Sequence, residues 1–258
     1  MNCIKLNNNV EMPILGFGVY RVEDYEECKK AILNAIEAGY RHIDTASIYL
    51  NEKAVGDAIK ESGINRKEMF ITTKLWIQDA DYDKAKKAFE MSIEKLGLDY
   101  LDLYLIHMPF GNYYAAWKAM EELYEAGYIR AIGCCNFYKD RLIDFASHTK
   151  ITPAINQIET HAFFQRWEEQ NLMKEYNITL ESWGPLAEGK NNIFNNEILK
   201  TIGKKYNKTI AQVILRWLTQ RNIPIIPKSV NKDRIIENSK IFDFTLDDND
   251  MNIIKTLD

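Results

Sequence analysis

The sequence predicts an α/β fold, and within that class a (β/α)8 TIM barrel with an N-terminal β-hairpin and two extra helices. The first supporting observation is that apolar, strand-like runs alternate with helical patterns about eight times in 258 residues, with short connections. The second is that the strands are nearly continuous apolar runs, as expected for a parallel sheet covered on both faces. Eight such units in about 250 residues are what this barrel requires. No linker or change in composition divides the chain, so residues 1–258 are predicted to form a single domain.

The expected strands are short runs of branched and aliphatic residues bounded by turn-forming residues. A hairpin comes first, with strands at 3–6 and 10–13 joined by the asparagine tract 7–9. The eight barrel strands are then expected at 14–20, 41–45, 70–75, 101–107, 129–135, 154–159, 179–183 and 223–226.

The expected helices show apolar residues three and four positions apart. They are predicted at 23–38, 52–62, 82–96, 113–126, 139–147, 168–176, 197–206, 209–220, 232–240 and 247–257. In four of them a glycine follows the last helical residue, and glycine often ends a helix in the left-handed conformation. These glycines are Gly39, Gly63, Gly97 and Gly127. Ten helices exceed the eight of the barrel by two, which accounts for the extra pair.

An open, doubly wound sheet is the alternative architecture for this alternation of strands and helices. It needs a glycine-rich phosphate loop that leads from the first strand directly into a helix. The chain has Gly16 and Gly18 at the first strand, but it lacks the third glycine and the helix that should follow at once. The barrel is therefore favoured.

The composition indicates a globular protein of the cytoplasm. Hydrophobic residues make up 46% and charged residues 27% of the chain, and the formal net charge of -4 argues against a nucleic-acid partner. No apolar run approaches the roughly 20 residues that span a bilayer, and the N-terminus lacks the apolar core of a signal peptide. The cysteines show no metal-binding spacing, so we expect free thiols and no metal site. They are Cys3, Cys28, Cys134 and Cys135.

Polar side chains stand where the predicted strands end. Asp44, Lys74 and His107 end the second, third and fourth strands, and Tyr49 lies in the loop after the second. In a parallel barrel these ends form the active site. A purely structural barrel has little reason to bring these groups together, because burying a Lys–Asp pair costs desolvation. The fifth and sixth strands add Asn136, Gln157 and Glu159.

The four residues at the second to fourth strands suit the reduction of a carbonyl group. A phenol is protonated at neutral pH, because its ordinary pKa is about 10. The ammonium group of Lys74 is expected to lower the pKa of Tyr49 and make it a stronger acid, with Asp44 holding Lys74 in place. A hydrogen bond from His107 could orient the carbonyl oxygen while a proton reaches the developing oxyanion.

Seven segments follow one another along the chain, namely GYRHIDTASIYLNE (39–52), KEMFITTKLW (67–76), LDLYLIHMP (101–109), IRAIGCCNF (129–137), NQIE (156–159), SWGPL (182–186) and IPKSVNKDRIIEN (226–238). Together they resemble the aldo-keto reductases, which are nicotinamide-dependent (β/α)8-barrel enzymes. They are similar to the bacterial group of 2,5-diketo-D-gluconate and methylglyoxal reductases. The resemblance implies a catalytic tetrad of Asp44, Tyr49, Lys74 and His107, the same residues that the strand ends select.

The resemblance also implies a binding track for NADPH. Its residues would be Cys135, Asn136 and Gln157 at the carboxamide, Trp183 on the nicotinamide ring, Leu186 along the pyrophosphate, Lys228, Ser229 and Arg234 at the 2'-phosphate, and Glu237 and Asn238 at the adenine. The residues themselves agree in part, since Lys228 and Arg234 flank the start of a predicted helix. A helix N-terminus beside two cations favours a phosphate, which predicts NADPH rather than NADH.

The chain departs from the family pattern at two positions near the site. Cys135 replaces the usual serine, and because a thiol is a weak hydrogen-bonding group we expect a weaker grip on the carboxamide and sensitivity to oxidants. Met108 replaces the tryptophan that commonly follows the catalytic histidine, and a flexible thioether should widen the pocket. Tyr20, Trp76 and Met108 are expected to form the walls of an open pocket with broad specificity.

The function expected from these observations is the NADPH-dependent reduction of aldehydes and ketones to alcohols by hydride transfer, with Tyr49 as general acid. The partner would be a small carbonyl compound, and methylglyoxal-like dicarbonyls, diketogluconate-like sugar ketones and aromatic aldehydes all fit. The family implies a monomer, and no membrane partner is expected. The alternative is a regulatory subunit that binds the cofactor with little turnover, like the cytoplasmic β-subunits of potassium channels.

Overall fold

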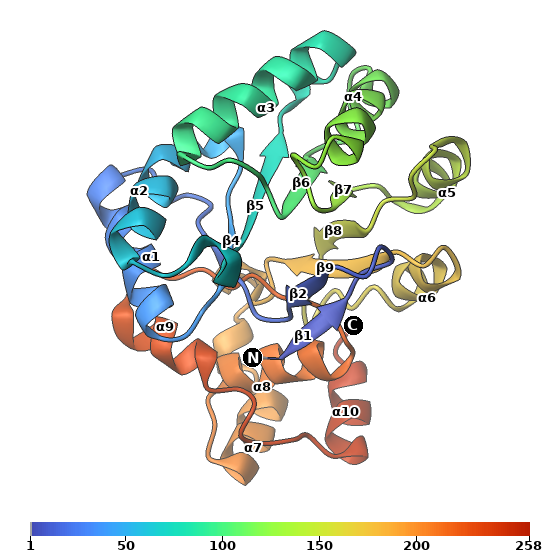
Figure 1. Ribbon diagram of the computed structural model, residues 1–258. Coiled ribbons are helices and arrows are strands. Elements are labelled where there is room, and N and C mark those ends of the chain that lie inside the picture. Colours follow the sequence, from blue (N-terminus) through green and yellow to red (C-terminus); the bar gives the residue numbers. More distant parts are fainter. Residues whose placement is uncertain (1) are drawn as a thin grey trace.

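A curled parallel sheet inside a ring of helices forms the centre of the computed structural model, which describes residues 2–258 (Figure 1). The seven strands follow one another in sequence order around the sheet, and every neighbouring pair is parallel. They are β3 (Phe17–Gly18), β4 (His42–Asp44), β5 (Phe70–Leu75), β6 (Leu103–Ile106), β7 (Ile132–Cys135), β8 (Ile155–Glu159) and β9 (Thr179–Trp183). The predicted α/β class is confirmed.

The two edges of the sheet are connected through Ile225. This residue forms isolated parallel bridges with Leu15 beside the first strand and with Ser182 in the last. Its N–H donates to the Ile14 carbonyl at 3.0 Å, and its own carbonyl accepts from the Gly16 N–H at 2.8 Å. Hydrogen bonds therefore run from each edge of the sheet to one short segment.

The predicted eighth strand at 223–226 is not confirmed as a regular strand and is represented by isolated bridges at Ile225, and the predicted strand at 14–20 is reduced to β3. Pro224 and Pro227 flank the bridging residue. Proline has no N–H to donate to a ladder, so neither residue can form both hydrogen bonds of a regular strand. Their carbonyls still accept, Pro224 from the Ser182 N–H at 2.8 Å and Pro227 from the Gly18 N–H at 3.2 Å. The sequence pattern indicated that the segment is apolar, but it did not indicate how few ladder hydrogen bonds the segment can form.

The helices lie around the outside of the strands, with α1 to α6 following their strands in turn (Figure 1). They are α1 (Tyr25–Glu37), α2 (Glu52–Ser62), α3 (Tyr82–Leu96), α4 (Tyr113–Glu125), α5 (Lys139–His148), α6 (Trp167–Glu175), α7 (Glu197–Tyr206), α8 (Ile210–Gln220), α9 (Lys232–Ser239) and α10 (Asp248–Lys255). The predicted bounds of α2, α3 and α7 are confirmed to the residue, as are those of β5 and β9. No helix in residues 2–258 is long and apolar enough to cross a membrane.

The predicted hairpin covers the end of the sheet where the strands begin. It consists of β1 (Cys3–Lys5) and β2 (Glu11–Pro13), which pair antiparallel. Its buried side chains Leu6 and Met12 pack with Phe70 and Leu103 at the starts of β5 and β6. Apolar side chains of the hairpin therefore pack against this end of the sheet, opposite the end where the strands finish.

The packing of α2 against α3 leaves no space for a side chain at Gly56. A Cβ atom placed there would lie 2.1 Å from the backbone oxygen of Leu96. The helix therefore uses a residue of poor helical propensity at this position because two backbones meet there. This contact holds the helix that directly follows the loop carrying Tyr49.

We predict that Gly56→Ala destabilises the protein, although alanine favours helices over glycine by about 1 kcal/mol. The overlap is with backbone rather than with a movable side chain, so the overpacking cost, typically about 1–3 kcal/mol, should exceed that gain. Urea denaturation should show a net loss of free energy of unfolding. Lys60→Ala, at an exposed position of the same helix, should change it by less than about 0.5 kcal/mol. A more stable Gly56→Ala protein would contradict the contact.

Candidate active site

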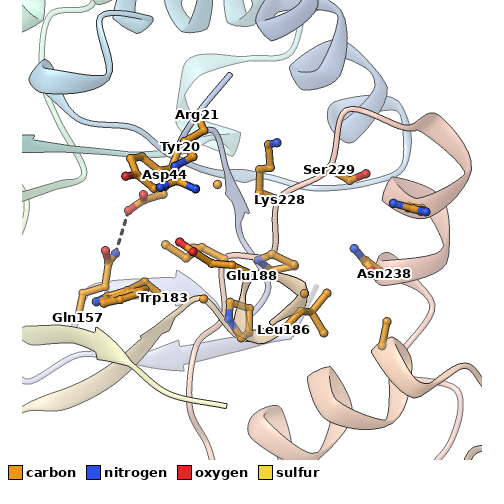
Figure 2. Close-up of a pocket in the computed structure, with 18 of the residues that line it drawn as sticks. Tyr20, Arg21, Asp44, Gln157, Trp183, Leu186, Glu188, Lys228, Ser229 and Asn238 are labelled. Atoms are coloured by element: carbon orange, nitrogen blue, oxygen red, sulfur yellow. Dashed lines mark hydrogen bonds between the residues drawn. The ribbon is translucent and has the colours of Figure 1, made fainter. Parts of the chain in front are cut away.

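A cavity of about 1550 Å³ lies at the carboxyl ends of the strands. Figure 2 shows Asp44 and Gln157 at one end of it and Ser229 and Asn238 toward the other, with Leu186 between. Nine of the ten predicted cofactor residues line it, namely Asn136, Gln157, Trp183, Leu186, Lys228, Ser229, Arg234, Glu237 and Asn238. The three predicted pocket walls, Tyr20, Trp76 and Met108, line it as well.

A buried ion pair forms the floor of the cavity. The Lys74 ammonium contacts the Asp44 carboxylate and donates a second hydrogen bond to the Thr45 carbonyl at 3.0 Å. Lys74 is fully buried. Burial alone would lower the pKa of Lys74, but Asp44 beside it raises that pKa above its ordinary value, so the ammonium stays charged. Neighbouring strands β4 and β5 supply the two residues, as the strand-end argument predicted.

Tyr49 lies above this pair, at the end of a short 3-10 turn (Ser47–Tyr49) that follows β4. The Lys74 nitrogen is 5.2 Å from the centre of its ring. Burial raises the pKa of Tyr49 to about 12, although Lys74 acts in the opposite direction. The predicted net lowering of this pKa is therefore wrong, because the loss of hydration outweighs the nearby charge. The phenol is fully protonated at neutral pH.

His107 follows β6 and faces the same part of the cavity. Its ring packs edge-on against Tyr49 and Trp76, with centroid distances of 5.6 Å and 5.0 Å. Burial, together with the charge of Lys74, lowers the pKa of His107 to about 3. The imidazole is therefore neutral and has one N–H to donate, as the proposed orienting role requires.

Gln157 links the ion pair to a carboxyl group that sequence reasoning missed. Its side-chain nitrogen donates to Asp44 Oδ2 and to Glu181 Oε2, each at 2.9 Å. Glu181 lies on β9 and is fully buried. The available signal was its position two residues before Trp183 in an apolar strand, because side chains two apart share a face.

Asn136 and Trp183 meet beside the tetrad. The Trp183 indole N–H donates to Asn136 Oδ1 at 3.0 Å, and the Asn136 amide donates to the His107 carbonyl at 3.2 Å. Asn136 has a φ of 63°, a left-handed conformation that asparagine tolerates better than most residues. These bonds orient both side chains at the edge of the cavity.

Cys135 is the one predicted cofactor residue that does not line the cavity. Only 1% of it is exposed, and its sulfur lies 4.0 Å from Gln157 Oε1 inside the sheet. Burial raises the pKa of the Cys135 thiol well above its ordinary value. The thiolate is the form that reacts with oxidants, so the structure does not favour the expected oxidant sensitivity.

The far end of the cavity suits a phosphate. The N-terminus of α9 points there, capped by Asn231, which accepts a hydrogen bond from the Arg234 N–H at 3.1 Å. Lys228 and Arg234 line this end with exposed, cationic side chains. Glu237 accepts a hydrogen bond from Thr209 at 2.8 Å beside them. Two cations and a helix N-terminus form a suitable anion site, so the residues present fit an adenosine phosphate.

Beyond the predicted Leu186, the segment after β9 contributes cavity-lining residues that sequence reasoning did not identify. Glu188, Phe194 and Asn195 line the cavity from this segment, and Arg21 faces it from the loop after β3. Figure 2 shows Glu188 over the middle of the cavity, close to Leu186. Positive φ angles at Ala187 and Glu188 fold the segment back, and no local pattern signals that turn.

Comparison with known proteins gives one family and several similar enzymes. The model of the Aldo/keto reductase family matches residues 15–258. The 9,11-endoperoxide prostaglandin H2 reductase of Trypanosoma cruzi (strain CL Brener) is 48% identical over 99% of this chain and 91% of its own length. The glyoxal reductase of Bacillus subtilis (strain 168) is 48% identical over 98% of this chain and 92% of its own length. The methylglyoxal reductase DkgA of Escherichia coli (strain K12) is 43% identical over 99% of this chain and 93% of its own length.

Solved structures share the fold as well. The aldo-keto reductase MGS-M4 from a Medee basin deep-sea metagenome library superposes with a TM-score of 0.96 at 46% identity, covering 99% of this chain and 94% of its own. An aldo-keto reductase of Bombyx mori in complex with NADP has a TM-score of 0.94 at 34% identity, covering 99% and 92%.

We predict that Asp44→Asn destabilises the protein more than the double variant Asp44→Asn/Lys74→Met. The single change leaves a fully buried ammonium without its counter-charge, and breaking such a pair typically costs about 3–5 kcal/mol. The double change removes the charge together with its partner, so part of the lost free energy of unfolding should return. Urea denaturation measures both. Lys53→Gln, which breaks an exposed ion pair with Asp57, should lower the free energy of unfolding by less than about 1 kcal/mol. Equal losses in the single and double Asp44 variants would argue against the pair.

Proposed function

This chain belongs to the aldo/keto reductase family and is an NAD(P)H-dependent oxidoreductase, and we propose that it reduces small aldehydes and ketones with NADPH, using Tyr49 as the proton donor. The observation that carries the proposal is the layout of one continuous cavity. The tetrad stands at one end of it, and a cationic helix N-terminus stands at the other. That layout fits a dinucleotide whose two ends differ in chemistry.

Proton transfer is the part of the reaction that this chain's own residues perform. The protonated phenol of Tyr49 can donate to a carbonyl oxygen as that oxygen gains negative charge. The phenolate that remains is stabilised by the Lys74 ammonium, 5.2 Å from the ring centre. Asp44 keeps Lys74 in place and neutralises part of its charge. The neutral imidazole of His107 donates a hydrogen bond that orients the carbonyl oxygen.

The proposed cofactor is NADPH, which when bound supplies the hydride for the carbonyl carbon. Asn136, Gln157 and Trp183 would hold the nicotinamide end, because they line the cavity nearest to the tetrad. Lys228 and Arg234 would hold the 2'-phosphate beside the α9 N-terminus. The Bombyx mori relative in complex with NADP supports this assignment.

The proposed substrates are small carbonyl compounds, with dicarbonyls such as glyoxal and methylglyoxal first among them. Relatives at 43% and 48% identity bear the names of reductases of these compounds. The mouth of the cavity is open, since Tyr20 is 47% and Leu50 82% exposed. An open mouth selects weakly between substrates, which supports broad specificity.

Four finer assignments accompany this proposal. We interpret residues 223–227 as the irregular eighth position of a (β/α)8 barrel, because they join both edges of the sheet. A single domain, a monomeric state and a cytoplasmic location remain predictions from the sequence. The alternative function, a regulatory subunit with little turnover, would bind NADPH through the same cavity and is separated from the reductase by the first experiment below.

We predict that Tyr49→Phe lowers kcat for methylglyoxal reduction by at least about 100-fold while NADPH still binds. General acid catalysis typically contributes about 10²–10⁴-fold, and phenylalanine keeps the ring without the proton. NADPH oxidation measured by absorbance gives the rate, and fluorescence titration gives the affinity. Tyr128→Phe is the control, since this tyrosine is exposed and does not line the cavity.

The comparison of these two variants decides between the functions. Loss of turnover in Tyr49→Phe alone supports the proton donor. Equal losses in both variants would contradict the role of Tyr49. The regulatory subunit would be favoured by a different result. In that case the wild-type protein binds NADPH and a stable protein partner, but no tested aldehyde or diketone causes NADPH oxidation.

We predict that Arg234→Gln raises the Kd for NADPH by about 10- to 100-fold, which corresponds to one lost charge-assisted hydrogen bond. The Kd for NADH, which lacks the 2'-phosphate, should change by less than about threefold. Lys232→Gln is the matched control, because this lysine begins the same helix but pairs with Glu37. A parallel rise for both dinucleotides would contradict the assignment of the phosphate site.

A further inference from the structure

Glu181 is a buried carboxyl group in the site that the proposed proton transfer does not use. It is fully buried on β9, and its Oε1 atom has no hydrogen-bond partner in residues 2–258. Burial, and then the charge of Asp44, raise the pKa of Glu181 to about 8, so the carboxyl is mostly protonated at neutral pH. A polar group kept in so apolar a position needs an explanation beyond packing.

The sheet register brings Glu181 beside Gln157. Cys135, Gln157 and Glu181 are paired partners on the adjacent strands β7, β8 and β9, so the three side chains form one row inside the sheet. Asp44 reaches the same amide from β4, which is not a neighbour of β8 in the strand order. Gln157 is therefore held from two directions across the interior.

The two carboxyl groups take both hydrogens of the Gln157 amide nitrogen. One N–H donates to Asp44 and the other to Glu181, each at 2.9 Å. If the amide were reversed, its oxygen would face the Asp44 carboxylate, and two acceptors would oppose each other. The amide oxygen, Oε1, is left with the weakly donating Cys135 thiol at 4.0 Å. Gln157 can thus offer only an acceptor to a ligand in the cavity that it lines.

We propose that Glu181 is a positioning residue which, together with Asp44, fixes the Gln157 amide so that its oxygen accepts a hydrogen bond from the carboxamide N–H of the nicotinamide. This inference rests on the proposed binding of a nicotinamide dinucleotide in the cavity. Asp44 alone would leave one N–H of Gln157 free to turn toward the ligand. Glu181 removes that freedom, and the site then distinguishes the NH2 side of the carboxamide from its oxygen.

The test compares two nucleotides that differ only at the proposed hydrogen bond. NADP+ carries the carboxamide, and in its 3-acetylpyridine analogue a methyl group replaces the NH2. Fluorescence titration measures both Kd values without turnover, and 2',5'-ADP reports the adenosine end separately. The wild-type protein should bind NADP+ about 3- to 10-fold more tightly than the analogue, as expected for one neutral hydrogen bond.

Two substitutions separate positioning from packing. Glu181→Gln matches the protonated carboxyl in shape and charge and keeps an acceptor for Gln157. The affinity ratio, which is the Kd of the analogue divided by the Kd of NADP+, should therefore stay at its wild-type value. Glu181→Met removes the acceptor, and the ratio should fall toward one while the Kd for 2',5'-ADP stays unchanged. Glu181→Leu serves if the methionine variant does not fold. Glu52→Met is the matched control, since Glu52 is also a buried carboxyl but bonds to Thr73 and not to Gln157.

The outcomes distinguish this inference from the proposed function. A wild-type protein that binds neither NADP+ nor 2',5'-ADP would overturn the proposed function itself. Binding of NADP+ and its analogue with equal affinity would overturn the acceptor role of Gln157 alone. The positioning role of Glu181 would be overturned if the affinity ratio stayed unchanged in Glu181→Met or Glu181→Leu. It would also be overturned if the ratio fell toward one in Glu52→Met as well.

Discussion

The burial of the Lys74 ammonium beside the Asp44 carboxylate is the interaction on which the rest of the site depends. Removing both charges from water is unfavourable, and only their close contact and further hydrogen bonds offset the cost. The further hydrogen bonds come from the Thr45 carbonyl, which accepts from Lys74, and from the Gln157 amide, which donates to Asp44. Burial, and then the charge of Lys74, lower the pKa of His107, and the same charge limits the rise that burial causes in the pKa of Tyr49. The pair thus acts, together with burial, on the protonation of both neighbours.

A line of polar groups extends from this pair across the interior, through Gln157 to Glu181. Its members come from β4, β5, β8 and β9, so it requires the curled sheet that brings these strands together. The line stays close to electrically neutral, because the ammonium balances one carboxylate and the second carboxyl is mostly protonated. Apolar side chains under the hairpin fill the opposite end. The polar line thus lies at one end of the cavity, and the cationic N-terminus of α9 lies at the other.

Sequence by itself determined much of the scaffold and the tetrad. The bounds of α2, α3 and α7 follow from local apolar periodicity and from caps that lie within a few residues of each helix end. The tetrad follows from a rule about strand ends, because polar residues that finish parallel strands meet at one edge. These are short-range patterns, and the structure brings the four side chains together as the rule requires.

Tertiary structure alone decided the features that depend on burial or on distant partners. The proline-flanked segment around Ile225 joins the sheet by isolated bridges, because its hydrogen bonds depend on both edges of the sheet at once. Cys135 is buried and does not line the cavity, and the pKa of Tyr49 rises instead of falling, since desolvation depends on the whole surrounding shell. Glu181 acquires its place only when the register sets it beside Gln157. Each of these results depends on partners that are far apart in the chain, so local patterns alone do not determine them.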